Sequence, residues 1–413
     1  MTELGEIPKD WSIKTINDLI KENIIIDVMD GNHGEIHPKA SEYVDIGIPF
    51  IMANNLKNGK LDIEGCKFIS YEQAKRLRKG FSVEGDVLLT HKGTLGETAI
   101  VPKLRDEYIM LTPQVTYYRV SNNNVLINRY LKVYFDSKKY QDKLKSFGSQ
   151  STRDYVGITE QRKLSIILPT IEEQEKIASI LSTVDEQIDN VDALIEKNKE
   201  LKKGLMQTLL TKGIGHTKFK KTEIGEIPEE WDVKKLECVF EILDSMRKPI
   251  KASDREKIEG NIPYYGASGV IDWINDYIFD EELILLGEDG ENLNSRNSDL
   301  AFKISGKTWV NNHAHVFRVI NKKECNIDFM VYYLEAKDYS IYIAGSAQPK
   351  ITQAQCIKFL LPLPEKQEQD KIASILLESD KKIEEYENKK QKLEELKKGL
   401  MQELLTGMIR VTV

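Results

Sequence analysis

The sequence predicts an α+β protein. We expect two mixed α/β domains separated by two long helices that form an antiparallel coiled coil, with a pseudo-twofold internal repeat relating the two halves. Three observations lead to this fold class. Segments at both ends of each half recur, two long stretches carry apolar residues at the heptad period, and short runs typical of β-strands lie between them.

The repeat is the strongest signal, because internal similarity decides architecture before local patterns do. Three segments occur twice: TELGEIPKDW at 2–11 and TEIGEIPEEW at 222–231, KIASIL at 176–181 and 371–376, and ELKKGLMQ at 200–207 and 395–402. The first pair is offset by 220 residues and the others by 195, so the middle of the first copy is 25 residues longer. Each half has similar end segments but a different sequence between them, which suggests that the protein performs one task at two places on one partner, with a different specificity at each.

These offsets divide the chain into a first domain at 1–170, a first helix at 171–212, a second domain at 213–364, and a second helix with a short tail at 365–413. Pro169 and Pro364 stand just before the helices, where a missing N–H does no harm. Steps of four and three residues separate the apolar positions Ile177, Leu181, Val184, Ile188, Val191 and Ile195, and Leu201 then continues the stripe with a changed phase. The apolar positions of the second copy include Ile372, Leu376, Ile383 and Leu396.

Such a narrow seam, flanked by Lys and Glu, is typical of a coiled coil with rods of roughly 60 Å. The alternative is that each helix packs separately on its own domain. The first helix delivers the chain to the second repeated head segment within a few residues, so rods running out and back would be antiparallel. The expected result is two heads on a helical spacer, with the chain termini close together.

Within the two domains, six runs favour strands: IPFIMA (48–53), DVLLT (86–90), VTYYRV (115–120), ELILL (282–286), KTWVNN (307–312) and HVFRV (315–319).

Composition favours a cytoplasmic globular protein. We find no apolar run long enough for a leader or a membrane span, and Cys66, Cys238, Cys325 and Cys356 lack metal or disulfide spacing. The net charge is −7; residues 1–170 carry +2 and residues 213–364 carry −5. Neither domain has the basic excess of a free-standing DNA-binding protein, so local patches or partner subunits would have to supply phosphate attraction.

Catalytic and metal motifs are weak. SGKT at 305–308 lacks the first glycine of a phosphate loop and precedes strand-like residues, and NIPYY at 261–265 lacks the first proline of an amino-methyltransferase motif. His313 and His315 would share one face of a strand but have no third ligand at sensible spacing. We therefore expect neither catalytic residues nor a metal site in this chain.

Polar clusters at strand ends are the candidates for recognising DNA. In the first domain these are the loop residues Thr90, His91, Lys92, Gly93 and Thr94, with Gln114 before the next strand and Arg76 and Arg78 as cations. In the second domain the corresponding places hold Asp289, Asn292, Asn294 and Arg296, and then Asn311, Asn312, His313 and His315. The alternative is that these are ordinary polar turns.

The ordered, duplicated motifs resemble the DNA specificity subunit of type I restriction-modification enzymes over essentially the whole chain. The resemblance rests on the paired GEIPxxW heads, the paired helix entries with Gln174 and Gln369, the paired ELKKGLMQxLLT tails, and GDVLLTHKGTLG (85–96), GEDG (287–290) and GKTWVNNHAHVF (306–317). It implies two target recognition domains, each reading one half of a split, asymmetric site in double-stranded DNA. The helices would scaffold the partners and set the half-site spacing; the residues expected to do so are Gln174, Ile177, Leu181, Ile188, Gln369, Ile372, Leu376 and Ile383.

The resemblance also implies that this chain is not an enzyme and carries no cofactor. Two modification subunits would hold S-adenosylmethionine, two restriction subunits would use ATP and magnesium, and no membrane would be involved. The pair Glu288 and Asp289 departs from expectation, because two acids stand where a reading loop would face DNA. Two alternatives remain: a specificity protein of a related system whose partner fuses modification and cleavage, or a helical-spacer interaction protein unrelated to DNA.

Overall fold

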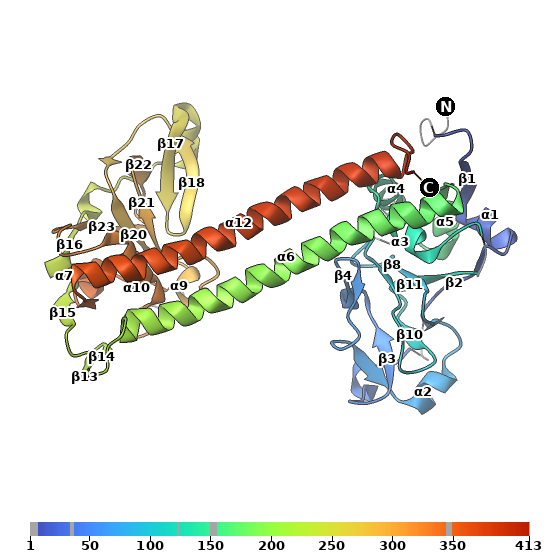
Figure 1. Ribbon diagram of the computed structural model, residues 1–413, viewed down its shortest axis with the longest axis horizontal. Coiled ribbons are helices and arrows are strands. Elements are labelled where there is room, and N and C mark those ends of the chain that lie inside the picture. Colours follow the sequence, from blue (N-terminus) through green and yellow to red (C-terminus); the bar gives the residue numbers. More distant parts are fainter. Residues whose placement is uncertain (1–6, 34–36, 122–123, 149–154, 344–348, 413) are drawn as a thin grey trace. The chain divides into compact units, whose positions relative to one another are not determined.

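The structure is a computed structural model that describes residues 7–33, 37–121, 124–148, 155–343 and 349–412. Residues 2–6 of the first repeated segment lie outside the described residues. The chain divides into two compact units, one formed by Met1–Asn190 with Lys389–Val413 and the other by Val191–Asn388. Each unit contains one mixed α/β domain, which we call the first or the second head, and part of each long helix (Figure 1).

The described part of the first head contains two four-stranded sheets, with strand orders β2-β11-β8-β9 and β6-β3-β10-β7, and the small pairs β1-β12 and β4-β5. Its strands are β1 (Ser12–Thr15), β2 (Ile25–Asp30), β3 (Ile48–Ile51), β4 (Leu56–Lys57), β5 (Lys60–Leu61), β6 (Lys67–Ile69), β7 (Phe81–Ser82), β8 (Val87–Thr90), β9 (Thr98–Ile100), β10 (Ile109–Leu111), β11 (Val115–Val120) and β12 (Ser165–Leu168). Its helices are α1 (Ile16–Lys21), η2 (Ala40–Glu42), η3 (Ala53–Asn55), α2 (Tyr71–Arg76), α3 (Asn128–Asp136), α4 (Lys138–Gly148) and α5 (Ile158–Gln161).

The second head repeats this topology, with sheets ordered β16-β23-β20-β21 and β18-β17-β22-β19 and with the pairs β15-β24 and β13-β14. Its strands are β13 (Phe219–Thr222), β14 (Gly225–Pro228), β15 (Asp232–Lys235), β16 (Phe240–Ile242), β17 (Glu259–Gly266), β18 (Gly269–Ile274), β19 (Phe279–Asp280), β20 (Leu283–Gly287), β21 (Ala301–Ile304), β22 (Lys307–Val310), β23 (Ala314–Val319) and β24 (Leu360–Leu363). Its helices are α7 (Leu236–Val239), η4 (Asp244–Met246), α8 (Ala252–Arg255), η5 (Glu256–Ile258), α9 (Asn292–Ser295), α10 (Ile327–Ala336) and α11 (Gln353–Cys356).

The two heads therefore share a frame although their sequences differ. In the first, β11 lies antiparallel between β2 and β8; in the second, β23 lies antiparallel between β16 and β20. The parallel pair β3–β10 likewise matches the parallel pair β17–β22. All six strand-like runs of the sequence coincide with strands of these sheets, and the predicted α+β class is confirmed.

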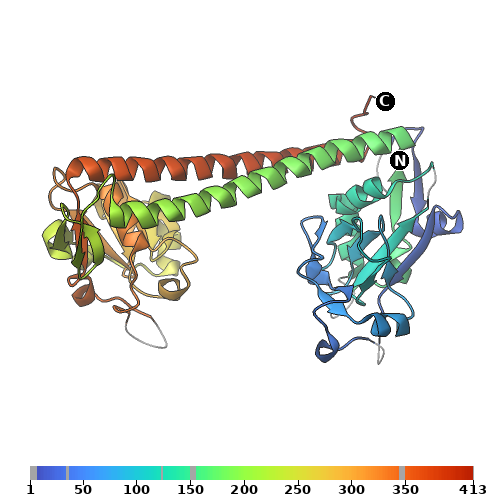
Figure 2. The same ribbon diagram turned by 60° about the horizontal axis from the view of Figure 1, so that its bottom comes forward.

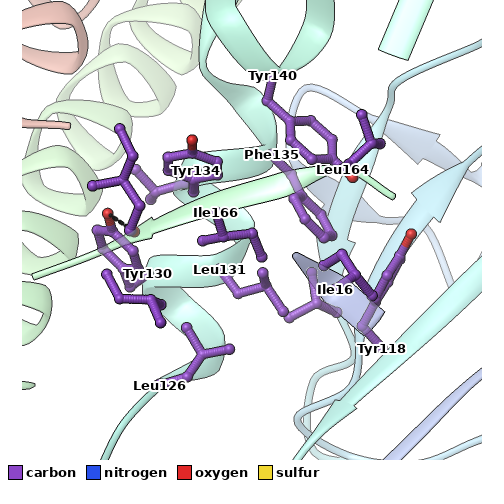
Figure 3. Packing of buried hydrophobic residues seen from close by; sticks show 14 of the residues in the cluster. Ile16, Tyr118, Leu126, Tyr130, Leu131, Tyr134, Phe135, Tyr140, Leu164 and Ile166 are labelled. Atoms are coloured by element: carbon purple, nitrogen blue, oxygen red, sulfur yellow. Dashed lines mark hydrogen bonds between the residues drawn. The ribbon is translucent and has the colours of Figure 1, made fainter. Parts of the chain in front are cut away.

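The core of the first head joins its sheets to its helices. Figure 3 shows Tyr118 of β11 beside Phe135 of α3, in a buried cluster that also contains Tyr130 and Leu131 of α3 and Ile166 of β12. The hydroxyl of Tyr130 donates to the carbonyl of Ile167 at 2.8 Å, so its polar end is satisfied. Burying each such large side chain stabilises the fold by roughly 1.5–3 kcal/mol.

The long helices are α6 (Ile171–Lys212) and α12 (Lys366–Leu404), which lie side by side in each unit in both views (Figures 1 and 2). In the unit with the second head, Lys199 pairs with Glu387 at 2.9 Å and Lys202 with Asp380 at 2.5 Å. The partner's number falls as the number on α6 rises, so the helices are antiparallel there. In the other unit, Lys397 pairs with Asp185 at 2.6 Å.

The seam differs from the prediction at one repeated position. Leu201 is 57% exposed and its repeat Leu396 is 50% exposed. Asn198 is buried instead, and its amide donates to the carbonyl of Leu194 at 2.7 Å. The heptad phase thus shifts in the ELKKGLMQ segments and leaves a leucine pointing outward in each. In the part of the chain that the structure describes, no helix is both long and apolar enough to cross a membrane.

Candidate nucleic-acid interface

In the first head, the loop after β8 is held by main-chain hydrogen bonds on both sides. The N–H of His91 donates to the carbonyl of Gln114, in the connection between β10 and β11, at 2.9 Å. The N–H of Val156 donates to the carbonyl of His91 at 3.0 Å. The next residue, Lys92, forms a main-chain bridge with Tyr155. The loop is therefore fixed without help from the side chains that it presents.

In the second head, the loop after β20 is held in the same way. The N–H of Glu288 donates to the carbonyl of His313, between β22 and β23, and the N–H of Ile351 donates to the carbonyl of Glu288, both at 2.8 Å. Asp289 then forms a main-chain bridge with Lys350. These matching bonds make Glu288 the counterpart of His91, Asp289 that of Lys92, and His313 that of Gln114.

The loop of the first head presents a cation and hydroxyls on an open turn. The hydroxyl of Thr90 is buried and accepts the N–H of Glu97 at 2.9 Å, which closes the loop. Lys92, Gly93 and Thr94 are exposed at its tip. Gly93 has φ +83° with open space where a Cβ would be, so the backbone itself is accessible there.

A second basic segment is tied to the end of β2. Asn32 accepts the N–H of Arg78 at 3.0 Å, and the ammonium of Lys79 pairs with Asp30. The side chains of Arg76 and Arg78 are exposed. Asp30 lies opposite Thr116 of β11, close to the start of that strand. The predicted cations Arg76 and Arg78 are therefore joined, through Lys79, to the end of the sheet that carries the Lys92 loop.

Beneath this loop lies a buried polar cluster of Asp30, His91 and Thr116. Nδ1 of His91 is 2.8 Å from the Thr116 hydroxyl, whereas its buried Nε2 has no hydrogen-bond partner in the described residues. Burial lowers the pKa of His91 to about 4, so the imidazole is neutral. Burial opposes the ionisation of Asp30, but hydrogen bonds from Lys79 and His33 outweigh it and lower its pKa.

The second head has a charged cluster in the equivalent place. His315 donates from Nδ1 to Asp244 at 2.6 Å and from Nε2 to the carbonyl of Ile351 at 2.8 Å. Burial alone would lower the pKa of His315, but the bond to Asp244 raises it to about 10. Glu288 is paired with Arg247 at 2.5 Å and with Lys350 at 2.9 Å. Burial acts against its charge, and these two cations nevertheless lower its pKa.

Asp244, Glu288 and His315 also bring three potential metal-ligand atoms within 4.8 Å of one another. Arg247 is 3.4 Å from Asp244 and 2.5 Å from Glu288, and its guanidinium also donates to the carbonyl of Ala314 at 2.7 Å. The carboxylates are therefore already balanced by cations. This chemistry is that of an ion-pair network supporting a loop, and Glu288 faces inward as part of it.

The surface of the second-head loop carries an acid–imidazole pair. Nδ1 of His313 lies 2.9 and 3.0 Å from the two carboxylate oxygens of Asp289. The side chain of His313 is 49% exposed and that of Asp289 17%. Asn312 and Asn294 are exposed nearby in sequence.

Comparison with known proteins identifies the family. The model of the type I restriction modification DNA specificity domain matches residues 8–202 and 228–395, once for each half. The chain belongs to this family. It is 30% identical to the type I restriction enzyme MjaVIII specificity subunit of Methanocaldococcus jannaschii over 436 residues, covering 98% of this chain and 94% of that protein.

Solved structures agree on the fold. The S subunit of a type I restriction-modification system from M. genitalium superposes with a TM-score of 0.60 at 16% identity, covering 98% of this chain and 99% of that one. A chain from a study of complex assembly and conformational transition of the type I R-M system gives 0.58 at 15% identity, covering 98% and 100%. The protein is thus a DNA sequence-specificity subunit with two target recognition domains, the two heads.

In this specificity subunit, four predicted DNA contacts need correction, and two others, Asn292 and Arg296, make hydrogen bonds within the chain. Thr90, His91, Asn311 and His315 are buried, so their side chains cannot reach a base edge. Asn311 instead accepts the N–H of His313 at 2.8 Å, and Asn292 closes a turn through two hydrogen bonds with Ser298. Arg296 donates to the carbonyls of Glu335 and Lys337 at the end of α10. The predicted contacts that remain at least partly accessible are Arg76, Arg78, Lys92, Gly93, Thr94, Gln114, Asp289, Asn292, Asn294, Arg296, Asn312 and His313.

The predicted scaffold residues of the specificity subunit work inside each unit. Gln174 donates to the carbonyls of Val125 and Pro169 at 2.8 and 3.0 Å and accepts the N–H of Ile127 at 3.2 Å. Gln369 makes the same three contacts in the second unit, with Glu324, Pro364 and Asn326. Apart from the half-buried Ile188, the apolar members are buried: Ile177, Leu181, Ile372, Leu376 and Ile383. Of these, Ile177 and Leu181 belong to the core of the first head, and Ile372 and Leu376 belong to that of the second, so with the two glutamines they anchor the helices to the heads.

A further repeated contact was missed at the sequence level. The indole of Trp11 donates to Glu173 at 2.8 Å, and Arg410 of the C-terminal tail binds the same carboxylate at 2.6 Å. In the second unit, Trp231 donates to Glu368 at 3.0 Å, and His216 of the linker lies 2.9 Å from it. The repeated tryptophan and glutamate were visible in the sequence and would have indicated this pairing. Arg410 also pairs with Asp10, which brings the C-terminal tail beside the N-terminal segment as expected.

Proposed function

We propose that each head of this subunit reads one half of a bipartite, asymmetric DNA site and that the chain itself performs no chemistry. Methyl transfer and cleavage would belong to partner subunits, which would hold S-adenosylmethionine, ATP and magnesium in the cytoplasm. The observation that carries the proposal is the pair of main-chain-fixed loops, presented at equivalent places on two equivalent sheets but with different side chains. A shared frame with exchanged loops is what two independent half-site readers require.

The repeated ELKKGLMQ segments support two copies of one modification subunit as partners. Leu201 and Leu396 are exposed at matched positions, although leucine normally seeks burial. Gly204 and Gly399 lie within the long helices, and apart from the adjoining residues and backbone of its own helix, no described part of the chain lies within 4 Å of where either Cβ atom would be. Glycine within a helix destabilises it by roughly 0.5–1 kcal/mol relative to alanine. Close approach of a partner helix would explain both the leucines and the glycines.

Three exposed cations, Arg76, Arg78 and Lys92, act against a net charge of −7, so we expect the isolated chain to bind DNA weakly and in a salt-sensitive way, with strong binding only after partners enclose the duplex. The test is to purify the full chain with its modification subunits and to map methylated adenines by single-molecule sequencing. We expect a two-part motif from the complex and no methyl transfer by the chain alone. Methylation without a bipartite motif, or robust transfer by the isolated chain, would refute the proposal.

Half-site spacing gives an independent test of the helices as a spacer. Inserting one heptad after Ile195 adds roughly 10 Å of helix while keeping the apolar period. At about 3.4 Å per base pair, the gap in the methylated motif should lengthen by up to about three base pairs, with both half-sites unchanged. An active complex that keeps its original gap would show that the helices do not set the spacing.

A further inference from the structure

Two positions in each head are matched by main-chain geometry, and they differ in charge between the heads. Lys92 directly follows His91, and Asp289 directly follows Glu288, the two residues whose N–H groups donate to the connection before the next strand. Lys92 and Asp289 also form equivalent main-chain bridges, with Tyr155 and Lys350. Gln114 and His313 supply the matching carbonyls. The same place on the frame therefore carries a cation with an amide in the first head and an acid with an imidazole in the second.

In the second head this place offers hydrogen-bond acceptors. A carboxylate has no donor, and Nδ1–H of His313 is directed at the oxygens of Asp289, at 2.9 and 3.0 Å. That contact orients the imidazole ring beside the carboxylate and holds Asp289 in place. The main chain of His313 is itself held by Asn311, at 2.8 Å, so the pair is oriented from below.

The major groove distinguishes bases by such patterns. Cytosine presents only its N4 amino donor, guanine presents two acceptors, adenine presents a donor and an acceptor, and thymine presents an acceptor beside a methyl group. A carboxylate, which only accepts, is complementary to cytosine, and it meets an acceptor on each of the other three bases. A lysine, which only donates, is complementary to guanine at the equivalent place.

We propose that Asp289, oriented by His313, reads a cytosine in the half-site of the second head, and that Lys92 reads a guanine at the equivalent place in the half-site of the first. This rests on the proposed function, since it assigns a base to loops already taken to face DNA. It also accounts for an acid at a DNA-facing loop: Asp289 is partly buried and paired, and its charge is directed at an amino group rather than at phosphate.

The test compares motifs methylated by complexes of the full-length chain with its modification subunits. Asp289→Asn adds an amide donor beside the remaining acceptor, which is the pattern that adenine requires. We expect discrimination for cytosine over adenine to fall roughly 5- to 150-fold at one position of the second half-site, with the first half-site unchanged. Lys92→Gln should relax one guanine position in the first half-site only.

Glu291→Gln is the matched control, because it removes the same charge from an exposed position two residues along the same loop. It should leave both half-sites unaltered. The base assignment is overturned if the parent motif lacks a G·C pair in either half-site, if both variants keep the parent motif, or if binding falls equally on all sequences. A bipartite parent motif in any of these cases would leave the proposed function standing, so the two failures are distinguishable.

Discussion

Replacing Gly204 and Gly399 by alanine should stabilise the isolated subunit and weaken its assembly. Both glycines lie inside α helices, neither has a positive φ, and each has open space at the Cβ position. Alanine is therefore compatible with the backbone and lowers the entropy of the unfolded chain. Each substitution should raise the free energy of unfolding by roughly 0.5–1 kcal/mol.

The same methyl group should obstruct a partner helix that packs against the glycine. Stability would be measured by hydrogen exchange of peptides covering each helix, because a chain with two units need not unfold in one step. Affinity for the modification subunit would be measured by calorimetry. Gly204→Ala and Gly399→Ala should each weaken the binding of one partner copy, and the double variant should weaken both.

Lys203→Ala is a suitable control on α6, since Lys203 is exposed and lies about 100° around the helix from Gly204. Stabilised alanine variants that bind the partner as tightly as the parent would refute the docking role of this face. Variants that are not stabilised at all would refute the assumption that the glycines lie in an unstrained, solvent-exposed helix.

Three further outcomes follow from the contacts within each unit. Gln174→Glu replaces the side-chain NH2 group, which donates to two main-chain carbonyls, by an oxygen that faces those carbonyls. Hydrogen exchange around the start of α6 should therefore show a loss of stability of roughly 3 kcal/mol in the first unit only. The pKa of His91 is near 4 in the folded chain and 6.5 when unfolded, so the first head should lose stability as pH falls from 6.5 towards 4. The pKa of His315 is near 10, so this group should stabilise the second head fully below pH 6.5 and progressively less as pH rises towards 10. Hydrogen exchange measured separately for each head across this pH range would distinguish the two effects. Arg410→Ala should speed exchange in residues 405–412, because the tail loses its bonds to Glu173 and to the N-terminal segment.

The helices, several strands and the equivalence of the two heads could be predicted from the sequence, because local and repeated patterns determine them. Heptad spacing predicted α6 and α12, alternating β-branched and aromatic residues predicted β11 and β23, and the repeats predicted that the heads are equivalent. The change of phase at Leu201 was visible in the sequence, but the pattern did not reveal that the shift leaves this leucine exposed.

The candidate site was predictable only in part. The loops after β8 and β20 were found from their glycines and polar residues, but the direction of each side chain was not. His315 is buried because Asp244 lies 71 residues away in sequence and meets it across the sheet, and Glu288 turns inward because Arg247 and Lys350 meet it there. Such partners come together only in the folded chain, so residue type alone could not separate the buried histidine from the exposed His313.

The main-chain attachment of the two loops bears on how such a protein can acquire new targets. The bonds that join the loops at residues 91 and 288 to the neighbouring connections are made by N–H and carbonyl groups, which every non-proline residue possesses. Lysine and aspartate stand at the next position of otherwise equivalent frames, so the architecture tolerates opposite charges there. Substitutions at that surface should therefore change the stability of the fold only slightly, whereas substitutions in the buried histidine and carboxylate clusters beneath would destabilise it. In each loop, exposed side-chain atoms can thus change the target sequence, while main-chain atoms of the same loop maintain the structure.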